Sequence, residues 1–256
     1  MVIIKHRYYK DIPALEVVQQ ESLDKKAPLI IFVHGFTSAK EHNLHYAFLL
    51  AEEGFRVILP DSIYHGERSS DLDANELNYM FWDIVINNIK ELTIIKTEII
   101  ESGLVDSNKI GVAGTSMGGI TTLGALTQYE WIQSGVSLMG SPHYEKFFWG
   151  QVQALKETNS TLPITDEQLK AQGELLKQYD LSLQPEKLNG RPLMFWHGER
   201  DQVVPFHYTY EFYKQIIPLY TGMEEKLKFI SDPALDHKVS REGLLATVAW
   251  FKKTLN

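Results

Sequence analysis

Short apolar runs alternate along the chain with longer segments of helical spacing. Residues 28–33 are a continuous run of aliphatic and aromatic side chains that ends at His34, which is typical of a central strand buried on both faces. Residues 2–9 and 14–19 are predicted as antiparallel strands at an edge of the sheet. Further strands are predicted at residues 55–59, 109–113, 135–139, 192–196 and 226–230.

Helices are predicted between these strands. In residues 83–101, apolar side chains recur every three or four positions, and Gly103 lies just beyond the end, as expected for a helix that covers a sheet. Others are predicted at residues 41–54, 117–129, 206–217 and 241–253. The alternation predicts an α/β fold, with a mostly parallel sheet, helices on both faces, and ligands at the carboxyl ends of the strands.

The alternation stops between residues 141 and 190. Pro142, Pro163 and Pro185 interrupt a stretch rich in Gln, Lys and Glu that contains helical segments at residues 147–157 and 165–179. We interpret residues 141–190 as a helical cap inserted into a single domain that spans residues 1–256.

Composition excludes several classes of function. The 25 Lys and Arg residues against 33 Asp and Glu give a net charge of -8 without a basic block, which argues against a nucleic-acid partner. The absence of cysteine excludes disulfides, thiolate nucleophiles and Cys-ligated metals. Neither a secretion signal nor an apolar run long enough for a membrane span is visible, so a cytoplasmic location is expected and the N-glycosylation pattern at Asn159, Ser160 and Thr161 carries no weight.

One motif carries chemistry. Gly114-Thr-Ser116-Met-Gly118-Gly119 matches G-x-S-x-G, the sharp strand-to-helix turn that exposes a serine hydroxyl above a sheet. The pattern also occurs by chance in glycine-rich connections, but here a predicted strand precedes it and a predicted helix follows. The glycine spacing does not match a dinucleotide-binding or phosphate-binding loop, and no cofactor is predicted.

With these features the chain resembles the serine α/β-hydrolase superfamily, and within it small bacterial esterases similar to prolyl oligopeptidase catalytic domains and dienelactone hydrolases. The resemblance covers nearly the whole chain, and dienelactone hydrolases share only the fold because their nucleophile is a cysteine. It rests on motifs that occur in the family's order, namely His34-Gly-Phe36, Asp61 with His65-Gly66, residues 114–119, residues 197–205 and Asp236-His237.

The resemblance implies a catalytic triad in the order serine, acid, histidine. Ser116 is the expected nucleophile, His237 the general base and Asp201 the acid that orients it. Glu199 and Asp232 are rival acids, and His207 is the rival base.

The backbone amides of Met117 and Phe36 are the expected oxyanion hole, the latter by resemblance. His34 is expected to organise its loop rather than to catalyse. Candidate substrate-binding residues are Tyr64, His65, Tyr144, Phe148 and Trp149, although residues 147–149 and Tyr144 could equally pack the cap onto the core. His42 and His45 lack an evident third ligand, so no metal site is predicted.

The predicted function is therefore hydrolysis of small or short-acyl carboxylic esters through an acyl-enzyme, without a cofactor. The same residues could instead cleave a peptide or amide, or transfer the acyl group to an acceptor other than water. A scaffold that binds a ligand or partner without turnover is the non-enzymatic alternative. Natural substrate and oligomeric state do not follow from the sequence.

Overall fold

The computed structural model describes residues 1–157 and 164–256, so the pattern at residues 159–161 lies outside the described residues. Its centre is an eight-stranded sheet in the order β1-β2-β4-β3-β5-β6-β7-β8. The first two strands pair antiparallel with their neighbours and the other strands run parallel. The strands are β1 (Val2–Tyr9), β2 (Ile12–Gln19), β3 (Ala27–Val33), β4 (Arg56–Pro60), β5 (Val105–Thr115), β6 (Ser134–Leu138), β7 (Leu193–Gly198) and β8 (Leu227–Asp232).

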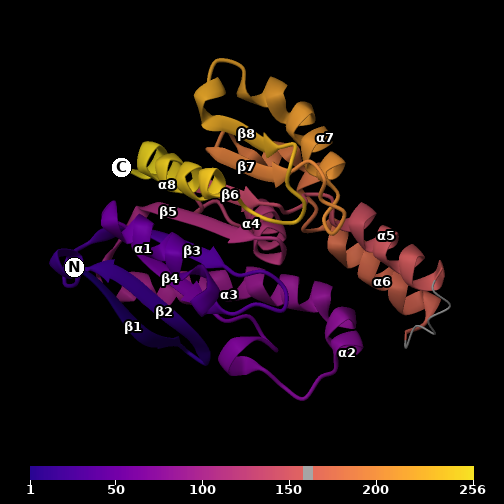
Figure 1. Ribbon diagram of the computed structural model, residues 1–256, viewed down its shortest axis with the longest axis horizontal. Coiled ribbons are helices and arrows are strands. Elements are labelled where there is room, and N and C mark those ends of the chain that lie inside the picture. The colour runs from indigo at the N-terminus through magenta and orange to yellow at the C-terminus, as the bar shows by residue number, and fades with distance from the viewer. Residues whose placement is uncertain (158–163) are drawn as a thin grey trace.

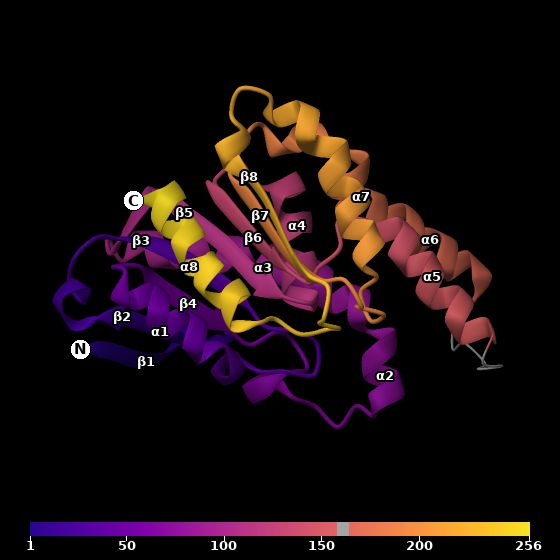
Figure 2. The same ribbon diagram turned by 45° about the horizontal axis from the view of Figure 1, so that its top comes forward.

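Helices cover both faces of this sheet, as the alternation predicts (Figures 1 and 2). With the strand order and the antiparallel β2, this is the α/β-hydrolase fold that the resemblance implies. Two apolar cores result, one between the sheet and α1 and α8, the other between the sheet and α3, α4 and α7. The helices are α1 (Leu44–Glu52), α2 (Ala74–Tyr79), α3 (Phe81–Glu101), α4 (Met117–Gln128), α5 (Tyr144–Glu157), α6 (Asp166–Lys177), α7 (Phe206–Ile216) and α8 (Arg241–Leu255).

Besides shifts of a few residues at the ends of elements, two local features differ from the sequence-based prediction. The helix expected at residues 41–54 begins as a 3-10 turn at Lys40–Asn43 and becomes α-helical at Leu44. Helix α2 was not predicted, because its stability comes from its first turn rather than from an apolar stripe. The Asp73 carboxylate accepts the Asn75 and Glu76 amides, and the Glu76 carboxylate accepts the Asp73 amide.

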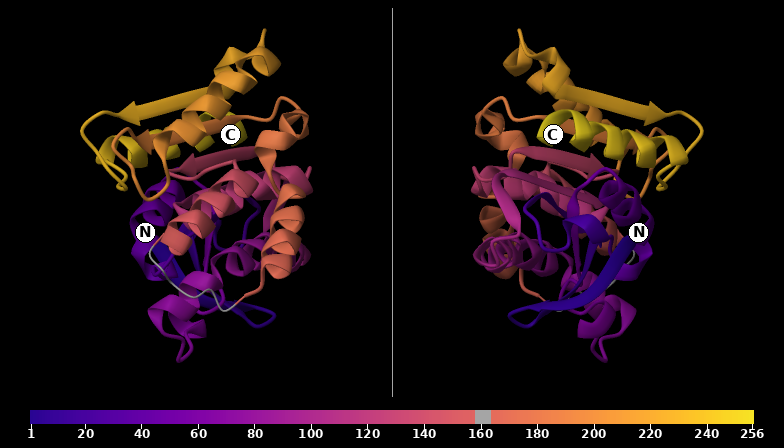
Figure 3. Two further views of the ribbon diagram at one scale, coloured as in Figure 1. Left: turned by 90° about the vertical axis from the view of Figure 1, so that its right-hand side faces the viewer. Right: turned by 90° about the vertical axis from the view of Figure 1, so that its left-hand side faces the viewer.

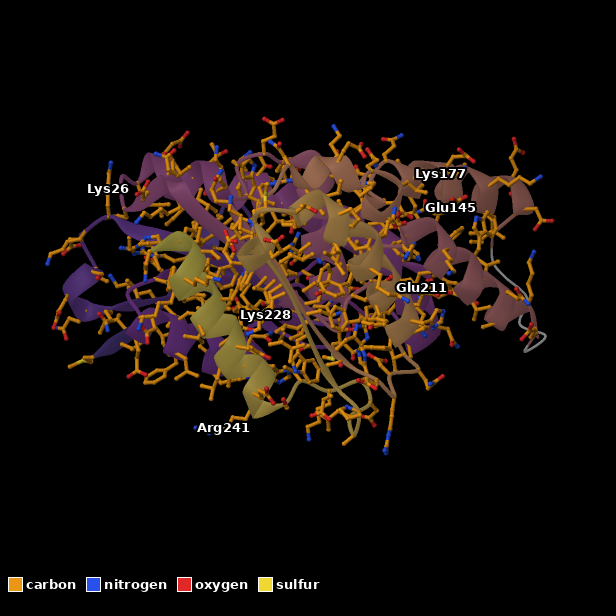
Figure 4. All side chains as sticks on the ribbon, turned by 90° about the horizontal axis from the view of Figure 1, so that it is seen from above. Lys26, Glu145, Lys177, Glu211, Lys228 and Arg241 are labelled. Atoms are coloured by element: carbon orange, nitrogen blue, oxygen red, sulfur yellow. The ribbon has the colours of Figure 1, made fainter. Side chains whose placement is uncertain are left out.

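The segment after β6 forms a pair of helices, α5 and α6, at the side toward which the parallel strands point (Figure 1). The pair stands at the opposite end of the molecule from β1 and β2 (Figure 3). Trp149 of α5 packs against Gly173 of α6, where a Cβ would lie 3.0 Å from the indole ring. Glu145 and Lys177 add a half-buried ion pair of 3.4 Å between the two helices (Figure 4).

Among the described residues, none of the helices has the length and apolar character needed to cross a membrane.

Candidate active site

Ser116 lies in a tight turn between β5 and α4. Its φ of 53° falls in the left-handed region, which a residue with a side chain adopts only under constraint, and its amide donates to the Leu138 carbonyl at 2.8 Å. The flanking glycines explain the motif. A Cβ on Gly114 would lie 2.4 Å from the Gly118 carbonyl carbon, and one on Gly118 would lie 2.0 Å from the Val33 carbonyl oxygen. The turn therefore needs glycine on both sides of the serine.

His237, in the loop after β8, meets this serine. Its Nε2 is 2.8 Å from the Ser116 Oγ, and its Nδ1 is 2.7 Å from an Asp201 carboxylate oxygen. Because an ionised carboxylate only accepts hydrogen bonds, Nδ1 carries the hydrogen and Nε2 is left to accept the serine proton. The three side chains thus form one hydrogen-bonded chain.

Asp201 is 2% exposed and fully engaged. One carboxylate oxygen accepts the Val203 and Val204 amides, each at 2.9 Å, and the other contacts His237 and His197. Burial alone would raise the pKa of Asp201, but the hydrogen bonds from His197, His237 and the Val204 amide outweigh it and hold the pKa well below the usual range. The carboxylate therefore stays ionised when His237 gains a proton.

Two neighbouring residues of β7 support this arrangement and were assigned no role from the sequence. The buried His197 places Nε2 at 3.1 Å from Asp201 and at 2.9 Å from the Val204 carbonyl, both acceptors, so this nitrogen donates. A Cβ on Gly198 would lie 2.3 Å from the Asp236 carbonyl oxygen, so glycine lets the His237 loop cross the strand. The signal in the sequence was the pair His197-Gly198 just before Asp201.

The rival residues have other partners. Glu199 accepts a hydrogen bond from the Ser231 hydroxyl at 2.7 Å, and Asp232 accepts the Ala234 amide at 2.9 Å. His207 is exposed on α7, with its ring against Tyr208. The carboxylate that contacts His237 is Asp201.

Phe36 and Met117, whose amides are the predicted oxyanion hole, flank the serine. A Cβ on Gly35 would lie 3.6 Å from the Ser116 Cβ, so the loop that carries Phe36 runs directly against the turn. Met117 is the first residue of α4, where a helix has amides without an intrahelical partner. Donation by the two amides to a substrate oxygen stays a prediction.

Ser116 opens into a cavity of about 370 Å³ beneath α5. Few polar groups line the cavity. One of them is the Gln151 side chain, which accepts a hydrogen bond from the Trp82 indole at 2.8 Å. The volume lies within the range for small-molecule sites. Apolar side chains from several separate segments of the chain form most of the wall, among them Phe36, Phe81, Trp82, Phe147, Phe148 and Val152.

Of the five predicted substrate-binding residues, Phe148 lines this cavity. The other four are not among its lining residues in the described part of the chain. Tyr144 is buried and donates to the Ile120 carbonyl at 2.6 Å, and Trp149 packs between α5 and α6. Both contacts agree with the packing alternative that the sequence left open for these two residues. Tyr64 and His65 belong to the loop after β4, where His65 accepts the Thr37 amide. Phe81 and Trp82, at the start of α3, were missed because the predicted helix began at residue 83.

His42 contacts the Ser38 hydroxyl at 3.1 Å, and within the described residues no three His, Asp or Glu side chains gather as metal ligands.

Comparison with known proteins places the chain in a family. Residues 42–256 match the prolyl oligopeptidase family, to which the chain belongs. It is a serine hydrolase of the α/β-hydrolase superfamily.

Two relatives align over their full length and the full length of this chain. "Putative esterase YitV" of Bacillus subtilis (strain 168) is 49% identical over 255 residues, and esterase YjfP of Escherichia coli (strain K12) is 31% identical over 261 residues. The solved structure of TT1662 from Thermus thermophilus has a TM-score of 0.75 at 19% identity, covering 100% of this chain and 99% of that one. That structure supports the fold alone.

Proposed function

We propose that the protein hydrolyses carboxylic esters of small or short-acyl acids through an acyl-enzyme at Ser116. The observation that carries this proposal is the hydrogen-bonded chain from Ser116 through His237 to Asp201 at the mouth of an apolar cavity. The names of the two full-length relatives support an ester as the substrate class. The cavity wall suits an apolar acyl group rather than a charged one. Residues 141–190 act as the cap over this cavity within one domain, and the location is cytoplasmic.

The proposed reaction has two halves. Ser116 Oγ attacks the ester carbonyl carbon while His237 Nε2 takes its proton, and the Phe36 and Met117 amides stabilise the oxyanion. The bond to the alkoxy oxygen then breaks, and His237 returns the proton to the departing alcohol. Water attacks the acyl-enzyme in the second half, with His237 again as base, and releases the acid and free Ser116.

Hydrolysis of p-nitrophenyl esters of increasing acyl length tests the proposal. Ser116→Ala should fold as the wild type does and lower kcat by about 10⁴-fold or more, because only the oxyanion hole and binding remain. His237→Ala should act similarly, whereas His207→Ala, the matched histidine on the exposed face of α7, should leave turnover unchanged. Full activity of Ser116→Ala, or equal losses in the two histidine variants, would exclude this assignment.

Amide cleavage is the second candidate, because the chain belongs to the prolyl oligopeptidase family. Peptidyl p-nitroanilides assayed beside the esters distinguish the two bonds. Labelling of Ser116 by a fluorophosphonate without turnover of either substrate would point to acyl transfer. An unlabelled, folded protein would point to the non-catalytic scaffold.

A further inference from the structure

Two loops at the carboxyl edge of the sheet are tied together by a pair of histidines. The β3 loop (residues 34–40) carries His34, and the β4 loop (residues 61–68) carries His65. His34 Nε2 accepts the Ser62 amide at 3.0 Å, and His65 Nε2 accepts the Thr37 amide at 3.0 Å. Each loop thus supplies a ring that binds the backbone of the other, and we call these two hydrogen bonds the histidine clasp.

The second nitrogen of each ring defines its protonation state. His34 Nδ1 is 2.7 Å from the Gly35 carbonyl oxygen, and His65 Nδ1 is 2.9 Å from that of Ile63. A carbonyl oxygen only accepts, so each Nδ1 carries a hydrogen, and each Nε2 must be bare to accept an amide. Both rings are therefore neutral. His34 is 0% exposed and His65 is 3% exposed, and this burial lowers the pKa of His34 to about 4 and the pKa of His65 below its usual value.

The histidine clasp binds the two loops at or next to residues with strained backbone conformations. Thr37, which donates to His65, has φ 59°, and Tyr64, which precedes His65, has φ 61°. Neither is glycine, so both need an external constraint to hold the left-handed conformation. Thr37 directly follows Phe36, whose amide is the proposed oxyanion donor, and the His65 ring lies edge-on to the Phe36 ring at 5.4 Å.

A buried ion pair joins the end of the β3 loop to the start of the β4 loop. Asp61 accepts the Lys40 and Glu67 amides, each at 3.0 Å, and the Lys40 ammonium at 2.5 Å. Lys40 is 1% exposed and Asp61 is fully buried. A buried pair with its hydrogen bonds satisfied holds a specific geometry. The β3 loop is consequently held at both of its ends by the β4 loop, with Phe36 between the attachments.

We infer that the histidine clasp aims the Phe36 amide at the substrate oxygen, which makes His65 and His34 positioning residues. This inference rests on the proposed function and deepens it. It replaces the substrate-binding role predicted for His65, whose Nε2 and Nδ1 are both occupied by backbone groups. An oxyanion donor acts mainly in the transition state, so loosening the clasp should affect the chemical step and leave ester binding nearly unchanged.

The test compares His65→Leu with His65→Gln. Leucine fills a similar space without an acceptor, whereas the glutamine carbonyl oxygen can take the place of Nε2. His65→Leu should lower kcat by about 10- to 100-fold with little change in KM, somewhat less than complete removal of an oxyanion donor. His65→Gln should recover most of that loss. Unchanged kcat in His65→Leu, equal losses in both variants, or a loss confined to KM would overturn the inference.

Two further measurements separate this inference from the proposed function. The rate at which a fluorophosphonate labels Ser116 should fall in His65→Leu and recover in His65→Gln, whether or not the wild type hydrolyses esters. In the wild type, ¹⁵N NMR at neutral pH should find His34 and His65 protonated at Nδ1 and bare at Nε2. A hydrogen on either Nε2 would overturn the clasp even if His65→Leu does not fold.

Discussion

The Ser116 turn and the cap helices α5 and α6 form two walls of one cavity, but different kinds of contact hold them. Around the turn, backbone packs on backbone: Gly114, Gly118 and the carbonyl of Val33 lie too close for any Cβ between them. In the cap, a side chain of one helix packs on the neighbouring helix, as Trp149 of α5 does at Gly173 of α6.

This difference separates the tasks of the two walls. Backbone cannot change rotamer to relieve a clash, so the turn admits a single geometry, which suits proton transfer and oxyanion binding. Side-chain packing tolerates substitution at modest cost, so the cap can change the shape of the cavity without moving the serine. We therefore expect the chemical step to depend on the turn and substrate selectivity to depend on the cap helices.

The largest expected contrast comes from the same substitution in each wall. Gly118→Ala should cost more than about 4 kcal/mol of unfolding free energy or prevent folding, since its Cβ would lie 2.0 Å from a backbone oxygen. Gly150→Ala, in α5, should gain about 0.5–1 kcal/mol, because the nearest atom, the Tyr208 hydroxyl, is 3.7 Å away and alanine favours a helix. Chemical denaturation of both variants measures the contrast, and similar effects at the two sites would contradict it.

The same contrast explains how far the sequence could predict the site. G-x-S-x-G predicted the turn correctly in kind, because glycines required by backbone contact leave a direct mark in the sequence. The order of Ser116, Asp201 and His237 led to three side chains that lie within hydrogen-bond distance, and their catalytic roles remain predictions. The alternation of strands and helices predicted the mostly parallel α/β sheet for a similar reason, since burial imposes a period, and the resemblance then implied the α/β-hydrolase fold.

The cavity wall was less predictable. Tyr144, Phe148 and Trp149 share one helix and one chemical character, but only the docking of α5 decides which of them faces the cavity. In the structure Tyr144 faces α4 and Trp149 faces α6. Apolar periodicity could not predict helix α2, because none of its residues is buried. The capping pattern from Asp73 to Glu76 was nevertheless visible in the sequence.

Protonation of His34, beside the Ser116 turn, should lower the unfolding free energy at acid pH more than protonation of His143 in the cap. His34 is fully buried, and its pKa is lowered from 6.5 to about 4. The unfolded chain therefore takes up this proton first. The contribution of neutral His34 to the unfolding free energy is fully present above pH 6.5. It falls by about 3 kcal/mol as the pH drops toward 4.

Denaturant titrations across that range, on matched variants, test the assignment. His34→Gln, which keeps an acceptor but does not titrate, should flatten the acid slope of the unfolding free energy. His143→Gln, at the start of the cap, should flatten it less, because His143 is only partly buried and its pKa is lowered to a smaller extent. An acid slope in His34→Gln as steep as that of the wild type would show that His34 does not supply this term.

The smallest predicted effect is a change in selectivity at the cap. Phe148→Ala enlarges the cavity without touching Ser116, so kcat/KM should rise for longer acyl chains relative to acetate by about 10-fold, the value of roughly one methylene in an apolar pocket. Trp149→Ala removes a neighbouring aromatic ring that packs on Gly173 outside the cavity wall, so it should lower stability and leave the acyl-length profile unchanged. Profiles of p-nitrophenyl esters for both variants measure the difference. The same profile in Phe148→Ala as in the wild type would mean that the acyl group lies elsewhere. The expectation that the cap determines acyl selectivity would then be wrong.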